Sequence, residues 1–218
     1  MTATADWFVR TLDRAQTQAQ PFRHWLLNDA LPDDVAHGIP ALPIAPPDIG
    51  DTLGKRETHN SKRIFFSAEN RERFPVCDEL ASALQDPAIV ERLEASTGAN
   101  LRGHFLRIEY CQDREGFWLE PHTDIGAKML TLLVYLSNHE DAANWGTDVM
   151  DPEGHVLARA PGTFNDGLLF VPAADTWHGF TRRPIRGVRR SLIVNYVKQE
   201  WRSRHELAFP DQPVVAAI

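Results

Sequence analysis

Two histidines and one aspartate carry the strongest chemical signal in the sequence. His122 and Asp124 are separated by one residue in the segment Pro121-His122-Thr123-Asp124. In an extended segment, side chains at positions i and i+2 point to the same side, so these two can converge on one metal ion. A third ligand must then come from elsewhere in the chain. His178, which lies on a later predicted strand, is a good candidate.

Two imidazoles and one carboxylate form the facial triad of non-haem Fe(II) sites, which leaves coordination positions open for other ligands. The residue types alone leave two alternatives open. The same three groups could bind Zn²⁺ in a hydrolase or in a structural site. They could also belong to a non-catalytic, cupin-like binding or sensor domain. A His-x-Asp triplet is weak evidence in isolation, so the choice between these alternatives depends on the surrounding sequence.

The surroundings of the triplet form an ordered series of short motifs. A buried apolar run, Leu130 to Asn138, follows Asp124 and contains Tyr135. Further along the chain come Trp145-Gly146-Thr147, Pro161-Gly162-Thr163 and Leu169-Phe170, followed by His178 and by Gly187-Val188-Arg189-Arg190-Ser191-Leu192.

This order of motifs resembles the Fe(II)/2-oxoglutarate-dependent oxygenases, specifically their prolyl-hydroxylase-like branch, over about residues 104–198. The resemblance implies a double-stranded β-helix, one Fe(II) ion, and 2-oxoglutarate consumed together with O₂. It places the metal ligands at His122, Asp124 and His178. It also implies that Arg189 pairs with the distal carboxylate of 2-oxoglutarate, and that Tyr135 and Tyr110 lie against the same cosubstrate.

The chemistry of the residues agrees with the role implied for Arg189. A planar guanidinium can hold a carboxylate with two parallel hydrogen bonds and stays charged in a closed pocket. Strand parity favours Arg189 over Arg190 as the inward-facing arginine, because the apolar Leu192 and Val194 then pack outward against helices. By the same parity, we expect Tyr135 to face inward with Thr131 and Leu133, and Tyr110 with Leu106 and Ile108.

The elements that must position these residues change character near residue 100. Before it, apolar spacing predicts helices over about residues 4–18, within 25–35, and over 78–93. Pro87 should divide the last of these, with Asp86 as the cap of the second piece. Residues 39–50 contain four prolines and should form an irregular loop.

After residue 100 the apolar runs are short and separated by Gly, Pro or Asn, which is typical of an antiparallel sandwich or barrel. The predicted strands are 105–110, 130–136, 147–150, 155–158, 167–171, 176–180 and 189–197. We expect an α+β, mainly β fold with a double-stranded β-helix (jelly-roll, cupin-like) core and N-terminal buttressing helices. Residues 1–218 should form one domain, with a helical support region (1–100), the β core (101–198) and a C-terminal tail (199–218).

Composition narrows the choice of partners. The formal charge of −7 argues against a nucleic-acid-binding surface, which needs a basic face. We found no run of about eighteen apolar residues that would span a membrane, and the charged N-terminus does not read as a signal peptide. With two cysteines and no disulfide framework, a cytoplasmic enzyme is the expectation.

We therefore expect a dioxygenase that hydroxylates a small or medium polar substrate and releases succinate and CO₂, with a prolyl residue in a protein as the alternative substrate. The sequence does not decide whether Lys128 binds the substrate or lies in a solvated turn. The same question stands for the arginines near His178, which are Arg182, Arg183, Arg186 and Arg190. Specificity should come from loops 112–119 and 139–145 at the mouth of the barrel.

Overall fold

A computed structural model describes residues 2–48, 53–56 and 63–215 of the chain. In this part of the chain the strands form two antiparallel sheets, one of seven strands and one of four. Among the described residues, no helix combines the length and the apolar character needed to cross a bilayer.

The first helix, α1 (Ala3–Arg14), begins at Thr2, whose hydroxyl accepts a hydrogen bond from the N–H of Ala5. Its apolar stripe, which includes Phe8 and Leu12, is buried. The helix is shorter than the predicted range of 4–18. Residues beyond it form the exposed strand β1 (Gln16–Gln18), which pairs with the next strand along the chain.

The helix predicted within residues 25–35 is wrong in its first part. Residues 24–27 form β2 (His24–Leu27), and the helix α2 (Asp33–Gly38) starts only after Pro32. Short apolar runs do not distinguish strand from helix by periodicity. The backbone groups of β2 are satisfied by pairing with β9 (Gly167–Phe170), a partner far away in sequence.

The predicted division of the longest helical segment is confirmed. After α3 (Ala68–Arg73), α4 (Pro75–Gln85) ends at Asp86, whose carboxylate accepts the N–H of Ala88 at the start of α5 (Pro87–Thr97). Pro87 has no N–H with which to continue α4, but it is suited to the first turn of a new helix. Residues 39–48 contain no helix or strand, and the last two residues of the predicted loop lie outside the described ranges.

All seven predicted strands overlap observed ones. The large sheet has the order β1-β2-β9-β6-β11-β4-β3, and the small sheet the order β5-β10-β7-β8. The strands not yet given bounds are β3 (Ile64–Phe65), β4 (Phe105–Asp113), β5 (Leu119–His122), β6 (Lys128–Tyr135), β7 (Asp148–Met150), β8 (Val156–Arg159), β10 (His178–Phe180) and β11 (Arg189–Val197). Two short 3₁₀ helices, η2 (Ala142–Trp145) and η3 (Arg204–Glu206), lie within the described loops.

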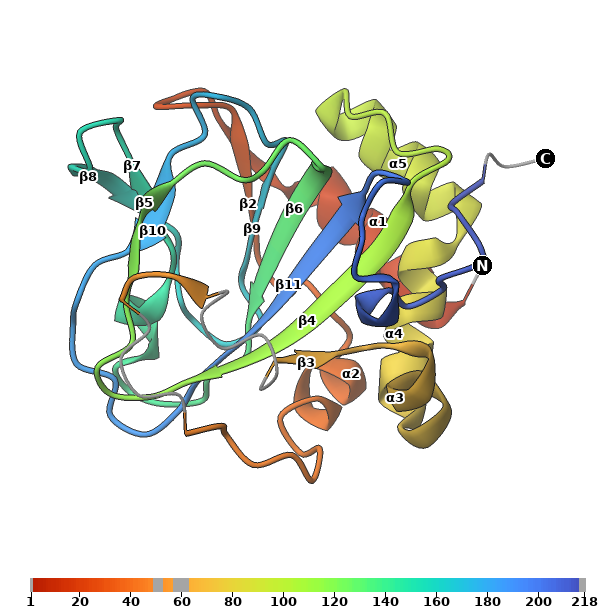
Figure 1. The fold of residues 1–218 in the computed structure, drawn as a ribbon, viewed down its shortest axis with the longest axis horizontal. Coiled ribbons are helices and arrows are strands. Elements are labelled where there is room, and N and C mark those ends of the chain that lie inside the picture. Colours follow the sequence, from red (N-terminus) through yellow and green to blue (C-terminus); the bar gives the residue numbers. More distant parts are fainter. Residues whose placement is uncertain (1, 49–52, 57–62, 216–218) are drawn as a thin grey trace.

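From β4 onward the chain passes back and forth between the two sheets, with β7 and β8 as consecutive strands of the small sheet. Strands β4, β6, β9 and β11 are neighbours in the large sheet, and β5, β7, β8 and β10 make up the small one. Eight strands shared in this way between two facing sheets are the arrangement of a jelly roll. Figure 1 shows the small sheet on one side of the large sheet and helices α1, α4 and α5 on the other.

The central strands of the large sheet are buried on both faces, and the two faces differ in composition. Its helix side forms the main apolar core together with Phe8 of α1 and Leu80 of α4. On β4, β6 and β11 the residues of that core are even-numbered and include Leu106, Ile108, Leu132, Val134, Leu192, Val194 and Tyr196. The odd-numbered residues of the same strands face the small sheet, and several of them are polar or charged.

Candidate active site

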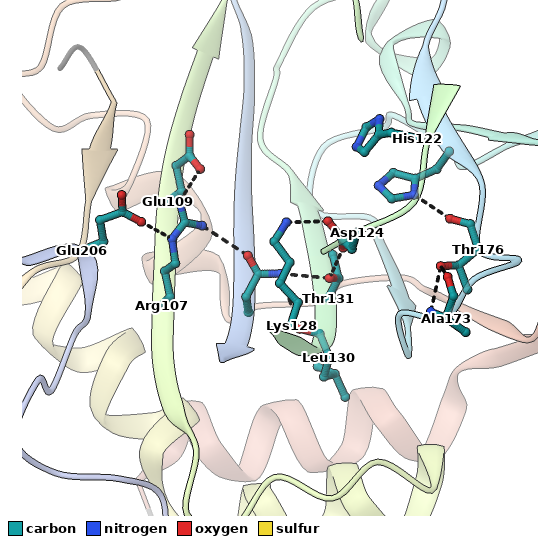
Figure 2. Close-up of polar contacts among 12 residues, drawn as sticks. Arg107, Glu109, His122, Asp124, Lys128, Leu130, Thr131, Ala173, Thr176 and Glu206 are labelled. Atoms are coloured by element: carbon teal, nitrogen blue, oxygen red, sulfur yellow. Dashed lines mark hydrogen bonds and ion pairs between the residues drawn. The ribbon is translucent and has the colours of Figure 1, made fainter. Parts of the chain in front are cut away.

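The structure brings the three predicted metal ligands together between the two sheets. His122 ends β5 and His178 begins β10, and the two residues are direct partners in the small sheet. Their ring centroids are 4.4 Å apart. Asp124 follows β5 closely, and the ligand atoms of all three residues lie within 4.8 Å of one another. Figure 2 shows His122 and Asp124 on the same side of the large sheet.

Backbone carbonyls orient both imidazoles. Nδ1 of His122 lies 2.8 Å from the carbonyl oxygen of Glu120, and Nδ1 of His178 lies 2.9 Å from that of Thr176. A carbonyl can only accept, so each Nδ1 carries a hydrogen, which leaves Nε2 as the ring atom that can bind a metal. Metal-binding histidines are commonly fixed in this tautomer by such contacts.

Both oxygens of Asp124 accept hydrogen bonds inside the protein. Oδ1 lies 2.5 Å from Nζ of Lys128 and Oδ2 lies 2.6 Å from Oγ1 of Thr131 (Figure 2). Burial alone would raise the pKa of Asp124, but the nearby charges, that of Lys128 first, and the hydrogen bonds from Lys128 and Thr131 together lower this pKa to about 2. The carboxylate is therefore ionised at neutral pH, as a metal ligand must be.

The electrostatics of His178 also suit a ligand. Burial of the ring, followed by the nearby His122, lowers the pKa of His178 to about 4. The imidazole is neutral at pH 7 and can donate a lone pair to a metal. Two oriented imidazoles and one ionised carboxylate fit Fe(II), whose facial triad has this donor set. The ligand role of these residues stays a prediction.

A cavity of about 300 Å³ opens beside the three residues. Its walls include residues from both sheets, among them Leu133, Thr147, Phe180 and Arg189. Arg189 faces this cavity, as strand parity predicted, while Leu192 packs on the helix side.

Arg189 is held by two hydrogen bonds, from Nε to the carbonyl oxygen of Trp145 (2.7 Å) and from Nη1 to Asp113 (2.6 Å). Its side chain is only 4% exposed. The same guanidinium lies over the ring of Phe180, with 4.6 Å between its carbon and the ring centroid. A buried cation fixed in this way can receive a carboxylate that enters the cavity.

The two predicted tyrosines lie on opposite faces of the large sheet. Tyr135 faces the barrel interior, where its hydroxyl accepts the backbone N–H of Thr147 at 3.1 Å. Arg189 lies 6.0 Å from its ring centroid, so Tyr135 borders the predicted cosubstrate region. A contact between Tyr135 and the cosubstrate stays a prediction.

The predicted inward orientation of Tyr110 is wrong. Tyr110 pairs with Leu192 across β4 and β11, and directly paired residues share a face of an antiparallel sheet. Both side chains belong to the helix-side core. Tyr110 is therefore separated from the cavity by the sheet, and Leu106 and Ile108 share its outward face.

Lys128 lines the cavity and pairs with Asp124, so it does not lie in a solvated turn. Two of the arginines near His178 form ion pairs with acidic residues. Arg183 pairs with the buried Asp148, and Arg186 lies 3.6 Å from Asp141. These pairs weaken the idea that the arginines together steer an anionic substrate.

The predicted mouth loop of residues 112–119 is shorter in the structure, where residues 114–118 connect β4 to β5 and pack against the barrel. Phe117 is buried and packs against Phe180, with ring centroids 5.6 Å apart, and its cluster includes Trp145 and Ile185. Phe117 therefore holds the loop against the barrel. Arg182 lies over the neighbouring Trp118, 4.5 Å from its ring centroid.

The sequence reasoning missed a set of charged residues on the inner face of β4. Arg107 is 1% exposed and donates to Glu206, Asn195 and Glu109 (Figure 2). Glu109 also accepts two hydrogen bonds from Arg63. At the end of the strand, Asp113 binds both Arg189 and Arg56. The signal was present, because polar residues occupy alternate positions of β4.

No protein-family model matches the sequence, and no curated protein matches it. Solved structures do match. A prolyl-4-hydroxylase from Pseudomonas putida superposes with a TM-score of 0.55 at 13% identity, covering 91% of this chain and 96% of the hydroxylase. A Trichoplax adhaerens prolyl hydroxylase, solved with a hypoxia-inducible-factor peptide, gives 0.58 at 13% identity, with 90% of each chain covered.

A third matching structure belongs to an enzyme that catalyses a different reaction. It is a non-haem, α-ketoglutarate-dependent epimerase from nogalamycin biosynthesis, with a TM-score of 0.53 and 14% identity, and it covers 89% of this chain and 83% of the epimerase. These superpositions establish the fold, but at such low sequence identity they do not establish the reaction. The alternating jelly roll, the supporting helices and these matches confirm the predicted double-stranded β-helix. The chain has the fold of the prolyl-hydroxylase-like Fe(II)/2-oxoglutarate oxygenases.

Proposed function

We propose that this protein is an Fe(II)- and 2-oxoglutarate-dependent dioxygenase that hydroxylates a small or medium-sized polar substrate. The observation that carries the proposal is the convergence of His122, Asp124 and His178 at one wall of a cavity whose other wall holds Arg189. A zinc hydrolase would account for the two histidines and the aspartate, but it would not account for a buried arginine facing the same cavity.

The chain's own residues prepare the metal site before any ligand binds. The carbonyls of Glu120 and Thr176 fix the two imidazoles with Nε2 available. Thr131 holds one oxygen of Asp124, which restricts rotation of the carboxylate. Ligands that are oriented in advance lose less conformational entropy when the metal binds.

Fe(II), bound with 2-oxoglutarate and O₂, would supply the oxidative chemistry, in which the cosubstrate becomes succinate and CO₂ and the substrate gains a hydroxyl group. Arg189 would receive the distal carboxylate and so set the direction in which the keto acid points. The rings of Phe117 and Phe180 flank this guanidinium and exclude water from it. A dry site strengthens the contact between the guanidinium and the carboxylate.

The size of the cavity supports the substrate class. About 300 Å³ lies at the lower end of the range of small-molecule sites, which is about 300–1,000 Å³. The cosubstrate would occupy part of this space, so the oxidised group must be small. The Trichoplax structure, which contains a peptide, supports the alternative that this group is a prolyl residue of a protein.

The test is anaerobic addition of Fe(II) and 2-oxoglutarate to the purified protein, followed by its optical spectrum. We expect a weak visible charge-transfer band, which Zn²⁺ cannot give. Admission of O₂ should then release succinate in amounts that depend on both additions.

The matched control is His178→Ala, which should lose the band and the succinate while keeping the fold. A mass-spectrometric screen of small metabolites and proline-containing peptides for a gain of 16 mass units would then identify the substrate. Binding of 2-oxoglutarate without any succinate would instead support a sensor domain.

A further inference from the structure

A buried carboxylate joins two arginines at the end of the cavity. Oδ1 of Asp113 lies 3.0 Å from Nη1 of Arg56, and Oδ2 lies 3.2 Å from Nη2 of Arg56 and 2.6 Å from Nη1 of Arg189. The side chain of Asp113 is 0% exposed. Both arginines line the cavity and Asp113 does not, so the carboxylate sits behind two guanidiniums that face the open space.

The position of Arg56 is fixed by local packing. Gly54 has a positive φ of 76°, and a Cβ at this position would lie 2.7 Å from the ring of Trp118. The carbonyl of Gly54 accepts the N–H of Glu120 in β5. Arg56 is therefore held against the strand that carries His122, and its guanidinium lies 4.7 Å from the ring centroid of Phe117. Arg189 lies 5.9 Å from the same ring.

The charges and hydrogen bonds of this cluster are incomplete. Two guanidiniums and one carboxylate leave one net positive charge in a buried position. Nε of Arg56 is buried and makes no hydrogen bond within the described residues. The hydrogen bonds of Arg189 among the described residues use Nε and Nη1. Buried polar groups normally find partners, so a donor left open beside a cavity indicates a ligand that accepts from it.

We infer that Arg56 and Arg189 form a two-arginine clamp for the distal carboxylate of 2-oxoglutarate, with Asp113 holding the two guanidiniums in register. This inference rests on the proposed function and adds Arg56 as a second cosubstrate-positioning residue. A carboxylate that enters the clamp brings the cluster to charge neutrality. It can also accept a hydrogen bond from Nε of Arg56, which has no partner among the described residues.

The clamp explains why a carboxylate lies behind the arginines. Two guanidiniums this close repel each other, and in a buried setting the repulsion would push them apart. Asp113 removes that repulsion and leaves one positive charge for the ligand. Arg189 alone, paired with Asp113, would form a neutral pair with little remaining attraction for an anion, so the charge that selects a dicarboxylate comes from Arg56.

The experiment compares two keto acids that differ at the distal end. 2-Oxoglutarate carries the distal carboxylate, and 2-oxopentanoate has a methyl group in its place. Each is titrated by calorimetry into the Mn(II)-loaded protein, which binds keto acids without turnover. In Arg56→Met we expect the affinity for 2-oxoglutarate to fall about 10- to 100-fold, because charge-assisted hydrogen bonds are lost. Binding of 2-oxopentanoate should change less than about twofold.

Arg63→Met is the matched control. Arg63 lines the same cavity and also pairs with a buried carboxylate, that of Glu109, but it does not touch Asp113. Its substitution should leave the preference for 2-oxoglutarate unchanged. Arg56→Lys keeps the charge and should recover part of the lost affinity, which distinguishes a ligand contact from a merely structural role.

Equal losses for the two keto acids in Arg56→Met, or an unchanged affinity for 2-oxoglutarate, would overturn the clamp. Recovery in Arg56→Lys together with a selective loss in Arg56→Met would establish it. Failure of the wild-type protein to bind either keto acid would overturn the proposed function, and the clamp with it.

Discussion

Lys128 should oppose metal binding, and its removal should both destabilise the metal-free protein and tighten its metal site. Its ammonium lies 2.5 Å from Oδ1 of Asp124, the carboxylate that a metal ion needs. The Asp124 side chain is 4% exposed and that of Lys128 is 19% exposed. In Lys128→Met the carboxylate stays buried and, among the described residues, keeps only the hydrogen bond from Thr131.

The magnitude follows from the two states. Removing one partner of a fully buried ion pair costs roughly 3–5 kcal/mol, and we expect about 2–3 kcal/mol here because the ammonium keeps some contact with water. In the metal-bound protein the metal compensates the charge of Asp124, so the same substitution costs little. The difference between the two states is a gain in metal affinity, of about 30- to 150-fold.

The assay is thermal unfolding of the metal-free protein together with calorimetric titration of Mn(II). Lys55→Met is the control, because Lys55 lines the same cavity but pairs, at 3.5 Å, with the half-exposed Glu120. It should alter neither quantity measurably. Weaker Mn(II) binding in Lys128→Met would refute the reasoning, since it would mean that the lysine supports the metal site.

Three further predictions concern the triad, the tyrosines and one buried acid. Alanine at any of the three predicted ligands should abolish succinate release with little change in the circular dichroism spectrum, because the apolar core does not include them. Tyr135→Phe should weaken 2-oxoglutarate binding measurably by calorimetry, whereas Tyr110→Phe should not, since Tyr110 lies on the helix side. Asp148→Asn should lower the free energy of unfolding by about 3 kcal/mol in denaturant titrations at pH 7, because two arginines would lose their buried partner. Burial alone would raise the pKa of Asp148, but its hydrogen bonds and arginines hold it below the usual range. The stabilising contribution of the Asp148 carboxylate is therefore present above about pH 4 and is lost as the pH falls further. The free energy of unfolding of Asp148→Asn should accordingly decrease less than that of the wild type as the pH falls through this range.

The shared direction of His122 and Asp124 and the face of Arg189 could be predicted because they depend on short-range geometry. His122 and Asp124 need only an extended backbone to point the same way. On β11 the alternation of Leu192 and Val194 with polar residues shows which face meets the helices. Such alternation is available without any knowledge of the partner strands.

Other features depend on contacts between distant segments. β2 forms because it pairs with β9, more than a hundred residues further along the chain. Arg56 and Asp113 are 57 positions apart, and no helix or strand is predicted at Arg56 from the sequence. No local pattern marks such pairs, so they appear only when the fold is known.

The error on Tyr110 has a different origin, since its cause was readable in the sequence. We assumed that an aromatic residue implied by the resemblance would face inward, and this choice placed Leu106 and Ile108 inside with it. The charged residues of the same strand argue for the opposite face. Arg107 and Glu109 cannot be buried against apolar helices without partners, whereas a polar cavity provides them. In a sheet buried on both faces, the alternating charged residues mark the side that holds the ligand, and the apolar residues mark the side that holds the core.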